Sequence, residues 1–175
     1  KLKDVIVERG QQETLKREER ALLALYELEA FGTHFDYDKS IMAKDRMRNY
    51  ILSLRDELNV LAGTVVRVGQ SKVLKDILFF KYGLNFANTD KSTLELIFTL
   101  EDVDPKAVRM VEIIGELRSL EKWYSTYLMN WIHEAEVYGN IVYPTYHQCG
   151  TVTGRVSSAF QQFPKKGKYT IDGEY

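Results

Sequence analysis

The sequence is poor in several features, and each shortage excludes a class of protein. It has one cysteine, Cys149, in 175 residues, so an internal disulfide framework and a zinc site made of cysteines alone are excluded. No apolar run approaches the roughly 18 residues of a membrane-spanning helix, and no signal-peptide pattern opens the chain. There is no internal repeat and no low-complexity segment. These shortages predict a globular protein of a reducing, cytosolic compartment without a membrane partner.

The chain also lacks an excess of charge of either sign. Its 24 lysine and arginine residues oppose 25 aspartate and glutamate residues, which gives a net charge of -1. This balance excludes a protein that binds nucleic acid through overall positive charge. A nucleic-acid partner therefore requires a local basic face.

The residues that could bind a metal ion or act as nucleophiles are not spaced as in a known type of metal or catalytic site. Cys149 has no helix start or basic neighbour that would activate its thiol, and no phosphate-binding glycine loop occurs. Acidic residues at 36–45 and 101–104 precede expected helices, where capping explains them. The histidines lack the spacing of metal ligands: His34, His133 and His147. We expect no catalytic residue, no metal site and no cofactor within this segment.

Apolar periodicity predicts that most of the chain is helical. Asp104 and Pro105 give the strongest start signal, because aspartate caps free N–H groups and proline at the first position has none to lose. Apolar residues recur at helical spacing in five segments bounded by capping residues or glycine: 11–30, 36–63, 71–83, 92–100 and 105–131.

A change of period from about 3.6 to 2 after Trp131 marks the start of a β region. Residues 134–148 predict a hairpin around Gly139-Asn140, and residues 151–157 predict a third antiparallel strand. The last six residues, TIDGEY, predict another turn whose return strand has only two residues. We therefore expect an α+β fold, and we expect the chain to be an excised piece of a larger protein.

Basic side chains gather on three of the predicted elements. Lys72 lies near the start of a short helix, and Arg118 and Lys122 share one face of the long helix because they are four residues apart. The third group surrounds the run TVTGRVSSAFQQFP at 151–164, which carries Arg155. Taken singly, each of these residues is more often a solvated charge than a phosphate ligand.

The run TVTGRVSSAFQQFP resembles the T-x-T-G-R-[LV]-S-S…L-Q-N-I-P motif of family A DNA polymerases, the DNA polymerase I class, at the junction of thumb and palm. RSLEKWYSTY at 118–127 is similar to that family's R-x-L-x-K-x-x-S-T-Y, and YHQCGT to its approach to the first motif. SKVLKDILFFKYGL resembles the thumb-tip helix, and YELEAFGTHFDYDKS resembles the start of the thumb. The matches come in the family's order over roughly residues 20–164. The family's D-P-N is missing before Phe160, a shortened form that looks phage-like.

The resemblance implies an architecture and an activity. Residues 1–131 would form a helical thumb with long antiparallel helices, including a palm-base helix, and residues 132–175 the small antiparallel sheet that begins the palm. The parent would be a DNA-directed DNA polymerase, a nucleotidyltransferase of DNA replication in the cytoplasm of a bacterium or a phage-infected cell. Its partners would be primer-template DNA, dNTP and the remaining palm and fingers. In the family, the palm carboxylates and the fingers follow this point, so Mg²⁺ is expected for the whole enzyme and the segment alone is expected to be inert.

The same resemblance implies which side chains meet the DNA near the primer terminus. Arg155 would enter the minor groove, where every Watson–Crick pair presents acceptors in nearly the same places. Gln161, and Gln162 in place of the family's asparagine, would offer amides toward the template side. Thr153 belongs to the same motif and is expected at this interface. Planar donors of this kind test the shape of a base pair without reading its sequence.

Phosphate contacts are expected from the helical part of the chain. Arg118 and Lys122 would contact the DNA backbone from the long helix, and Lys72 from the thumb tip, which positions a duplex without specifying its sequence. Two alternatives stay open at this point. One is a fragment of a single-subunit RNA polymerase of related fold, and the other is a helical protein-interaction module that binds no nucleic acid.

Overall fold

The computed structural model describes residues 2–148, 151 and 153–158 of the chain. Two compact units are present. One combines residues 1–37 with residues 133–175, and the other consists of Asp38–Ile132. The sequence-based division into a thumb over residues 1–131 and the start of a palm over 132–175 stays a prediction.

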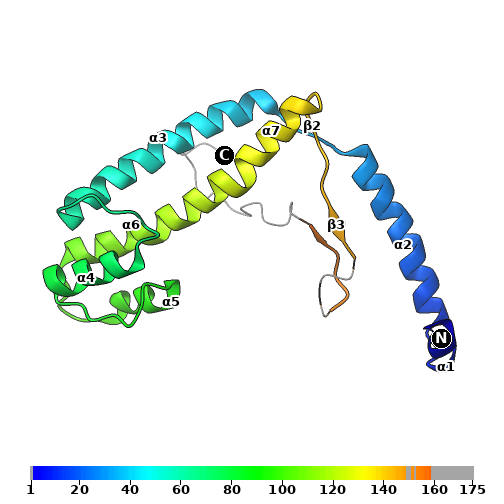
Figure 1. Cartoon of the computed structure of the whole chain (residues 1–175), viewed down its shortest axis with the longest axis horizontal. Coiled ribbons are helices and arrows are strands. Elements are labelled where there is room, and N and C mark those ends of the chain that lie inside the picture. Colours follow the sequence, from blue (N-terminus) through cyan, green and yellow to red (C-terminus); the bar gives the residue numbers. More distant parts are fainter. Residues whose placement is uncertain (1, 149–150, 152, 159–175) are drawn as a thin grey trace. The chain divides into compact units, whose positions relative to one another are not determined.

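The second unit is helical. Its elements are α3 (Tyr37–Ala62), α4 (Ser71–Tyr82), α5 (Lys91–Leu94), the 3₁₀ helix η1 (Glu95–Thr99), α6 (Pro105–Lys122), the π-helix η2 (Trp123–Leu128) and α7 (Met129–Val137), of which α3 and α7 begin or end in the other unit. Figure 1 shows α3 and α6 side by side, with α4 and α5 near one end of the pair. Hydrogen bonds from Tyr50 to Glu116 and from Arg109 to Glu57 show that α3 and α6 are antiparallel.

Local signals explain where these helices begin and end. The Asp104 carboxylate accepts a hydrogen bond from the backbone N–H of Lys106 at 2.8 Å, and Pro105 is the first helical residue of α6. Helix α4 ends at Gly83, whose φ of 70° is left-handed. The Leu84 N–H then bonds the Leu78 carbonyl at 2.9 Å, which closes a glycine C-cap. Both ends agree with the sequence-based prediction.

The core of the helical unit lies along α6. Its buried face presents side chains at a spacing of three and four residues, as expected for one helix face, and α3 and α4 contribute leucines to the buried set. The side chains with 0% exposure are Leu58, Leu74, Leu78, Ala107, Met110, Ile113, Ile114 and Leu117.

The described residues of the first unit include helices α1 (Leu2–Glu8) and α2 (Gln12–Phe31) and two small antiparallel sheets. In one sheet β1 (Thr33–His34) pairs with β2 (Ile141–Val142), with Thr33 opposite Val142. In the other, β3 (Tyr146–His147) pairs with β4 (Ser157–Ser158). The predicted class, α+β with a mainly helical part and a small antiparallel β part, is confirmed.

The hairpin predicted over residues 134–148 is wrong. Helix α7 continues through Val137, because Ile132 and Ala135 are buried at helical spacing. The Asn140 N–H bonds the Ala135 carbonyl at 2.8 Å, and Gly139 and Asn140 both adopt positive φ. The turn residues therefore end a helix instead of joining two strands.

The third strand predicted over 151–157 is shorter than expected in the described residues. Only Ser157 of that range lies in β4. The Thr151 hydroxyl accepts a hydrogen bond from the Arg155 N–H at 2.8 Å, and the Gly154 N–H bonds the Thr151 carbonyl at 3.1 Å. These bonds fold residues 151–155 into a turn.

Candidate nucleic-acid interface

Arg155 and Thr153 lie together on the turn that precedes β4. Both residues are exposed. The Thr151 hydroxyl fixes the turn from two sides, because it accepts from the Arg155 N–H at 2.8 Å and donates to the Arg155 carbonyl at 3.0 Å. No hydrogen bond or ion pair engages the Arg155 guanidinium within the described residues. The backbone of Arg155 is held in place while the residue is exposed.

The other two residues predicted for this part of the interface, Gln161 and Gln162, lie outside the described residues. Their proposed contact with the template side stays a prediction. The same applies to the predicted turn near residue 172.

Lys72 is the second residue of α4 and is exposed. The two other lysines of this helix are bound within the protein. Lys75 Nζ donates to the Ala87 carbonyl at 3.2 Å, and Lys81 Nζ donates to the Leu61 carbonyl at 2.7 Å. No comparable bond is present for Lys72 among the described residues.

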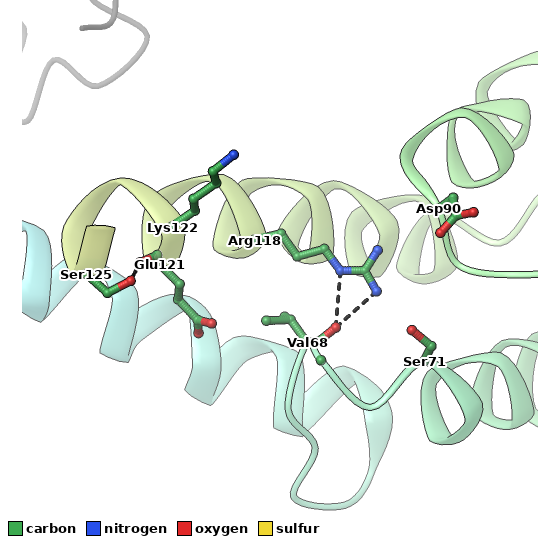
Figure 2. A pocket seen from close by; sticks show the side chains of 8 residues that line it. Val68, Ser71, Asp90, Arg118, Glu121, Lys122 and Ser125 are labelled. Carbon is green, nitrogen blue, oxygen red and sulfur yellow. Dashed lines mark hydrogen bonds between the residues drawn. The ribbon is translucent and has the colours of Figure 1, made fainter. Parts of the chain in front are cut away.

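Arg118 and Lys122 both line one open hollow of about 380 Å³ beside α6. Gly69 and Asp90, from the loops before α4 and α5, and Ser71, the first residue of α4, contribute to the same hollow. Figure 2 shows that the two cations point differently, with the Arg118 guanidinium turned toward Val68 and the Lys122 side chain extended away from it. The sequence predicted correctly that the two residues share one helix, but their side chains have different surroundings.

The charge of the hollow depends on which side chains are already paired. Glu121 accepts two hydrogen bonds from Arg55, at 3.0 and 2.9 Å, so its carboxylate is compensated. Lys122 is exposed and has no partner in the described part of the chain. Asp90 also lines the hollow and offsets part of the positive charge.

Polar contacts join α3 to α6 and to α4, where the Tyr82 hydroxyl donates to the Leu61 carbonyl of α3 at 2.8 Å. The Arg109 guanidinium beside Glu57 lowers the pKa of that carboxyl below its usual range, mainly through the hydrogen bond between them. A hydrogen bond to Glu116 raises the pKa of Tyr50, and burial raises the pKa of Tyr82. These groups hold helices together and are not arranged as an acid–base pair.

Sequence reasoning missed the π-helix η2, which covers Trp123–Leu128 within the similarity at 118–127. Its wider turn follows Lys122 directly, and the Trp123 and Tyr127 rings both contact Trp131, at centroid distances of 6.3 and 5.6 Å. A helix of this type is usually a single turn inserted in an α-helix, often at a functional site. The aromatic run WYSTY was a signal for tight packing but not for the change of helix type.

No group of three or more potential metal-ligating side chains occurs in the described part of the chain. None of the helices described there is long and apolar enough to cross a membrane.

Comparison with known proteins decides the family. The model of DNA polymerase family A matches residues 39–171, which include the helical unit and the turn of Arg155. The chain belongs to DNA polymerase family A. Curated relatives named DNA polymerase I agree with this assignment. The chain is 30% identical over 159 residues to the protein from Caldicellulosiruptor bescii and 31% identical over 166 residues to that from Rhizobium leguminosarum.

The coverage of these family A relatives is unequal. The alignments include 85% and 90% of this chain, but only 18% and 16% of the two relatives. The chain therefore spans less than one fifth of the length of the DNA polymerase I proteins that it matches. Both relatives are bacterial, and the phage-like form suggested by the shortened motif stays a prediction.

Proposed function

We propose that this chain is the thumb and the first palm strands of a DNA-directed DNA polymerase, and that it grips primer-template duplex during templated nucleotide addition. The family match over residues 39–171 carries the proposal. Within that segment, Lys72, Lys122 and Arg155 are exposed cations whose side chains have no protein partner among the described residues. Both relatives are DNA polymerases, which favours this activity over the RNA polymerase alternative.

Arg155 suits the minor groove for a physical reason. Purine N3 and pyrimidine O2 are acceptors that every correct base pair presents at similar positions. A guanidinium on a fixed backbone turn offers several donors in one plane. Arg155 would bond the primer-terminal pair, with Thr153 beside it and Gln161 and Gln162 toward the template strand. Such contacts reward the geometry of a correct pair whatever its sequence.

Lys72 and Lys122 suit contacts with the phosphate backbone of the DNA. An exposed ammonium attracts phosphate oxygens without selecting a base, so these contacts set the position of the duplex. Arg118 differs, since four of its N–H donors are used within the protein. The whole enzyme would also need dNTP, the remaining palm and fingers, and Mg²⁺ bound by carboxylates outside this segment, which stabilises the charge of the transferred phosphoryl group. The segment alone would then be catalytically inert.

The proposal is tested by measuring the affinity of the chain for a primer-template duplex as a function of salt. Lys122→Ala should reduce the slope of log K against log[salt] by about 0.9, because one phosphate contact is lost. Arg155→Ala should weaken binding by roughly 1–3 kcal/mol, the range for a good base contact, with a smaller change in slope. Lys16→Ala is the matched control. Lys16 pairs with Glu13 and lies outside the family match, so this variant should bind like the wild type.

A chain that binds no duplex, or whose binding is equally insensitive to all three substitutions, would contradict the proposal. The second result is what a protein-interaction module predicts. Nucleotide incorporation by the segment alone, with primer-template, dNTP and Mg²⁺, would contradict its proposed inertness.

A further inference from the structure

The Arg118 side chain turns into the helical unit and holds two loops. Nε and Nη2 donate to the Val68 carbonyl at 3.1 and 3.0 Å, and Nη2 also donates to the Thr89 hydroxyl at 3.0 Å. Nη1 donates to the Thr89 carbonyl. A guanidinium has five N–H groups, so one remains for any external ligand. Figure 2 shows the Arg118 guanidinium between α6 and the loop that carries Val68.

The acceptors of these bonds are poorly placed to bond water instead. Val68 is 6% exposed and Thr89 is 1% exposed. Loss of Arg118 would leave two carbonyls and a hydroxyl in a largely buried region without their donors, which is more costly than the loss of an exposed bond. The contacts join residues 50 and 29 positions apart in sequence. Arg118 therefore fixes two loops to α6.

Each of these loops leads directly into a helix. Val68 lies three residues before Ser71, the first residue of α4, and Thr89 lies two residues before Lys91, the first residue of α5. The short turn between Val68 and α4 has little freedom of its own, since the Gln70 N–H bonds the Arg67 carbonyl at 2.9 Å. A shift of the Val68 carbonyl would therefore also shift the first turn of α4, which carries Lys72.

Lysine could not make the same set of contacts. The guanidinium is a planar fork that reaches two carbonyls and a hydroxyl at once, whereas an ammonium is a point charge with no fixed plane. The residue type thus agrees with a bridging role. A phosphate ligand at this position would be served by either side chain.

We propose that Arg118 is a positioning residue. It holds the loops before α4 and α5 so that Lys72 is presented to the DNA backbone, and it is not itself a phosphate ligand. The inference rests on the proposed grip on duplex DNA.

The first test is a mutant cycle between Arg118 and Lys72, read as affinity for a primer-template duplex at several salt concentrations. Lys72→Ala should reduce the salt slope by about 0.9. Arg118→Ala should reduce both affinity and slope by a similar amount, and the double variant should bind within twofold of Arg118→Ala. Two independent phosphate ligands would instead multiply the losses and reduce the slope by about 1.8, twice the value for one contact. That result would overturn the proposal.

Two more variants separate positioning from charge and from stability. Arg118→Lys keeps the charge but loses the bridge, so it should bind like Arg118→Ala; wild-type binding by this variant would contradict the proposal. Thr89→Val removes one acceptor at nearly constant volume and serves if Arg118→Ala does not fold. It should weaken duplex binding in the same direction, by a smaller factor. A variant that unfolds at lower urea concentration but binds duplex like the wild type would also contradict the proposal.

Amide hydrogen exchange provides a reading that needs no DNA. In Arg118→Ala, the amides of residues 66–73 and 89–92 should exchange at least tenfold faster, while the central amides of α3 and α6 keep their protection. If the wild type binds no duplex, the proposed function fails, and the exchange pattern still decides whether Arg118 holds the loops. If the wild type binds but exchange at the two loops is unchanged in Arg118→Ala, the positioning role fails and the proposed function stands.

Discussion

Replacing Glu57 by glutamine removes one half of the ion pair that joins α3 to α6. The Arg109 guanidinium donates from Nε to Glu57 Oε1 at 2.8 Å and from Nη2 to Oε2 at 2.9 Å. The two side chains are 42% and 41% exposed, so water screens the pair. This geometry is a two-point fork, which is stronger than a single contact between the same charges.

The expected magnitude follows from exposure and geometry together. Exposed ion pairs contribute about 0.2–1 kcal/mol, and the forked geometry places this pair near the upper end of that range. A loss of 1 kcal/mol lowers the thermal unfolding midpoint by about 4–8 °C for a unit as small as Asp38–Ile132. Because Arg109 lowers the pKa of Glu57, the pair stabilises the fold above the reference value of 4.5, and this contribution is lost as the pH falls through the folded-state pKa.

The assay is urea unfolding followed by tryptophan fluorescence at pH 7 and at pH 3. Both tryptophans, Trp123 and Trp131, lie in the helical unit, so the signal reports on the unit that contains the pair. A double-mutant cycle of Glu57→Gln with Arg109→Gln should give a coupling energy of about 0.5–1 kcal/mol at pH 7, as for a well-formed exposed pair, and a smaller one at pH 3.

Glu95→Gln is the matched control. Its partner Lys91 lies 3.7 Å away, and both side chains are more than half exposed, so no measurable loss is expected. A coupling energy between Glu57 and Arg109 that is zero at pH 7, or that is the same at both pH values, would refute the reasoning.

Three further predictions concern the fold. Leu117→Ala should destabilise the helical unit by about 2–5 kcal/mol, because Leu117 is 0% exposed and its truncation leaves a cavity; an effect below 1 kcal/mol in urea unfolding would contradict the described core. Gly32→Ala should disrupt the β1–β2 pairing, since Gly32 has φ +70° and an added Cβ would lie 2.5 Å from Ile141 Cγ2; amide exchange at Phe35, which bonds the Asn140 carbonyl, should rise while exchange at Leu117 stays unchanged. Asp104→Ala should lower the stability of the helical unit by about 1 kcal/mol through loss of the helix cap, and Asp104→Asn, which keeps a capping oxygen, should recover most of it.

Local signals in the sequence were sufficient for most helices. The start at Asp104-Pro105 and the end at Gly83 are determined by residues within one turn of the boundary, and the structure has them as expected. The end of α7 was missed because Gly139 and Asn140 suit a hairpin turn as well as a helix cap. Only a distant partner decides between the two, since Ile141–Val142 pairs with Thr33–His34, more than 100 residues earlier.

The candidate site, like the fold, could be predicted from the sequence only in part. Arg155, Lys72 and Lys122 are exposed, as charged side chains usually are, and the family resemblance pointed to them. The partners of Arg118 could not be predicted, because Val68 and Thr89 offer backbone carbonyls, which every residue has. Which carbonyl faces a guanidinium depends on the packing of loops 50 and 29 residues away in sequence.

Hydroxyl-radical footprinting of a primer-template duplex tests the central claim most directly, because the radicals attack sugars that line the minor groove. The proposed grip predicts that the wild-type chain protects the sugars of the last few base pairs at the primer 3′ end, and that Arg155→Ala loses this protection while Lys16→Ala keeps it. Uniform cleavage along the duplex, or protection of the terminus that is unchanged in Arg155→Ala, would contradict the claim.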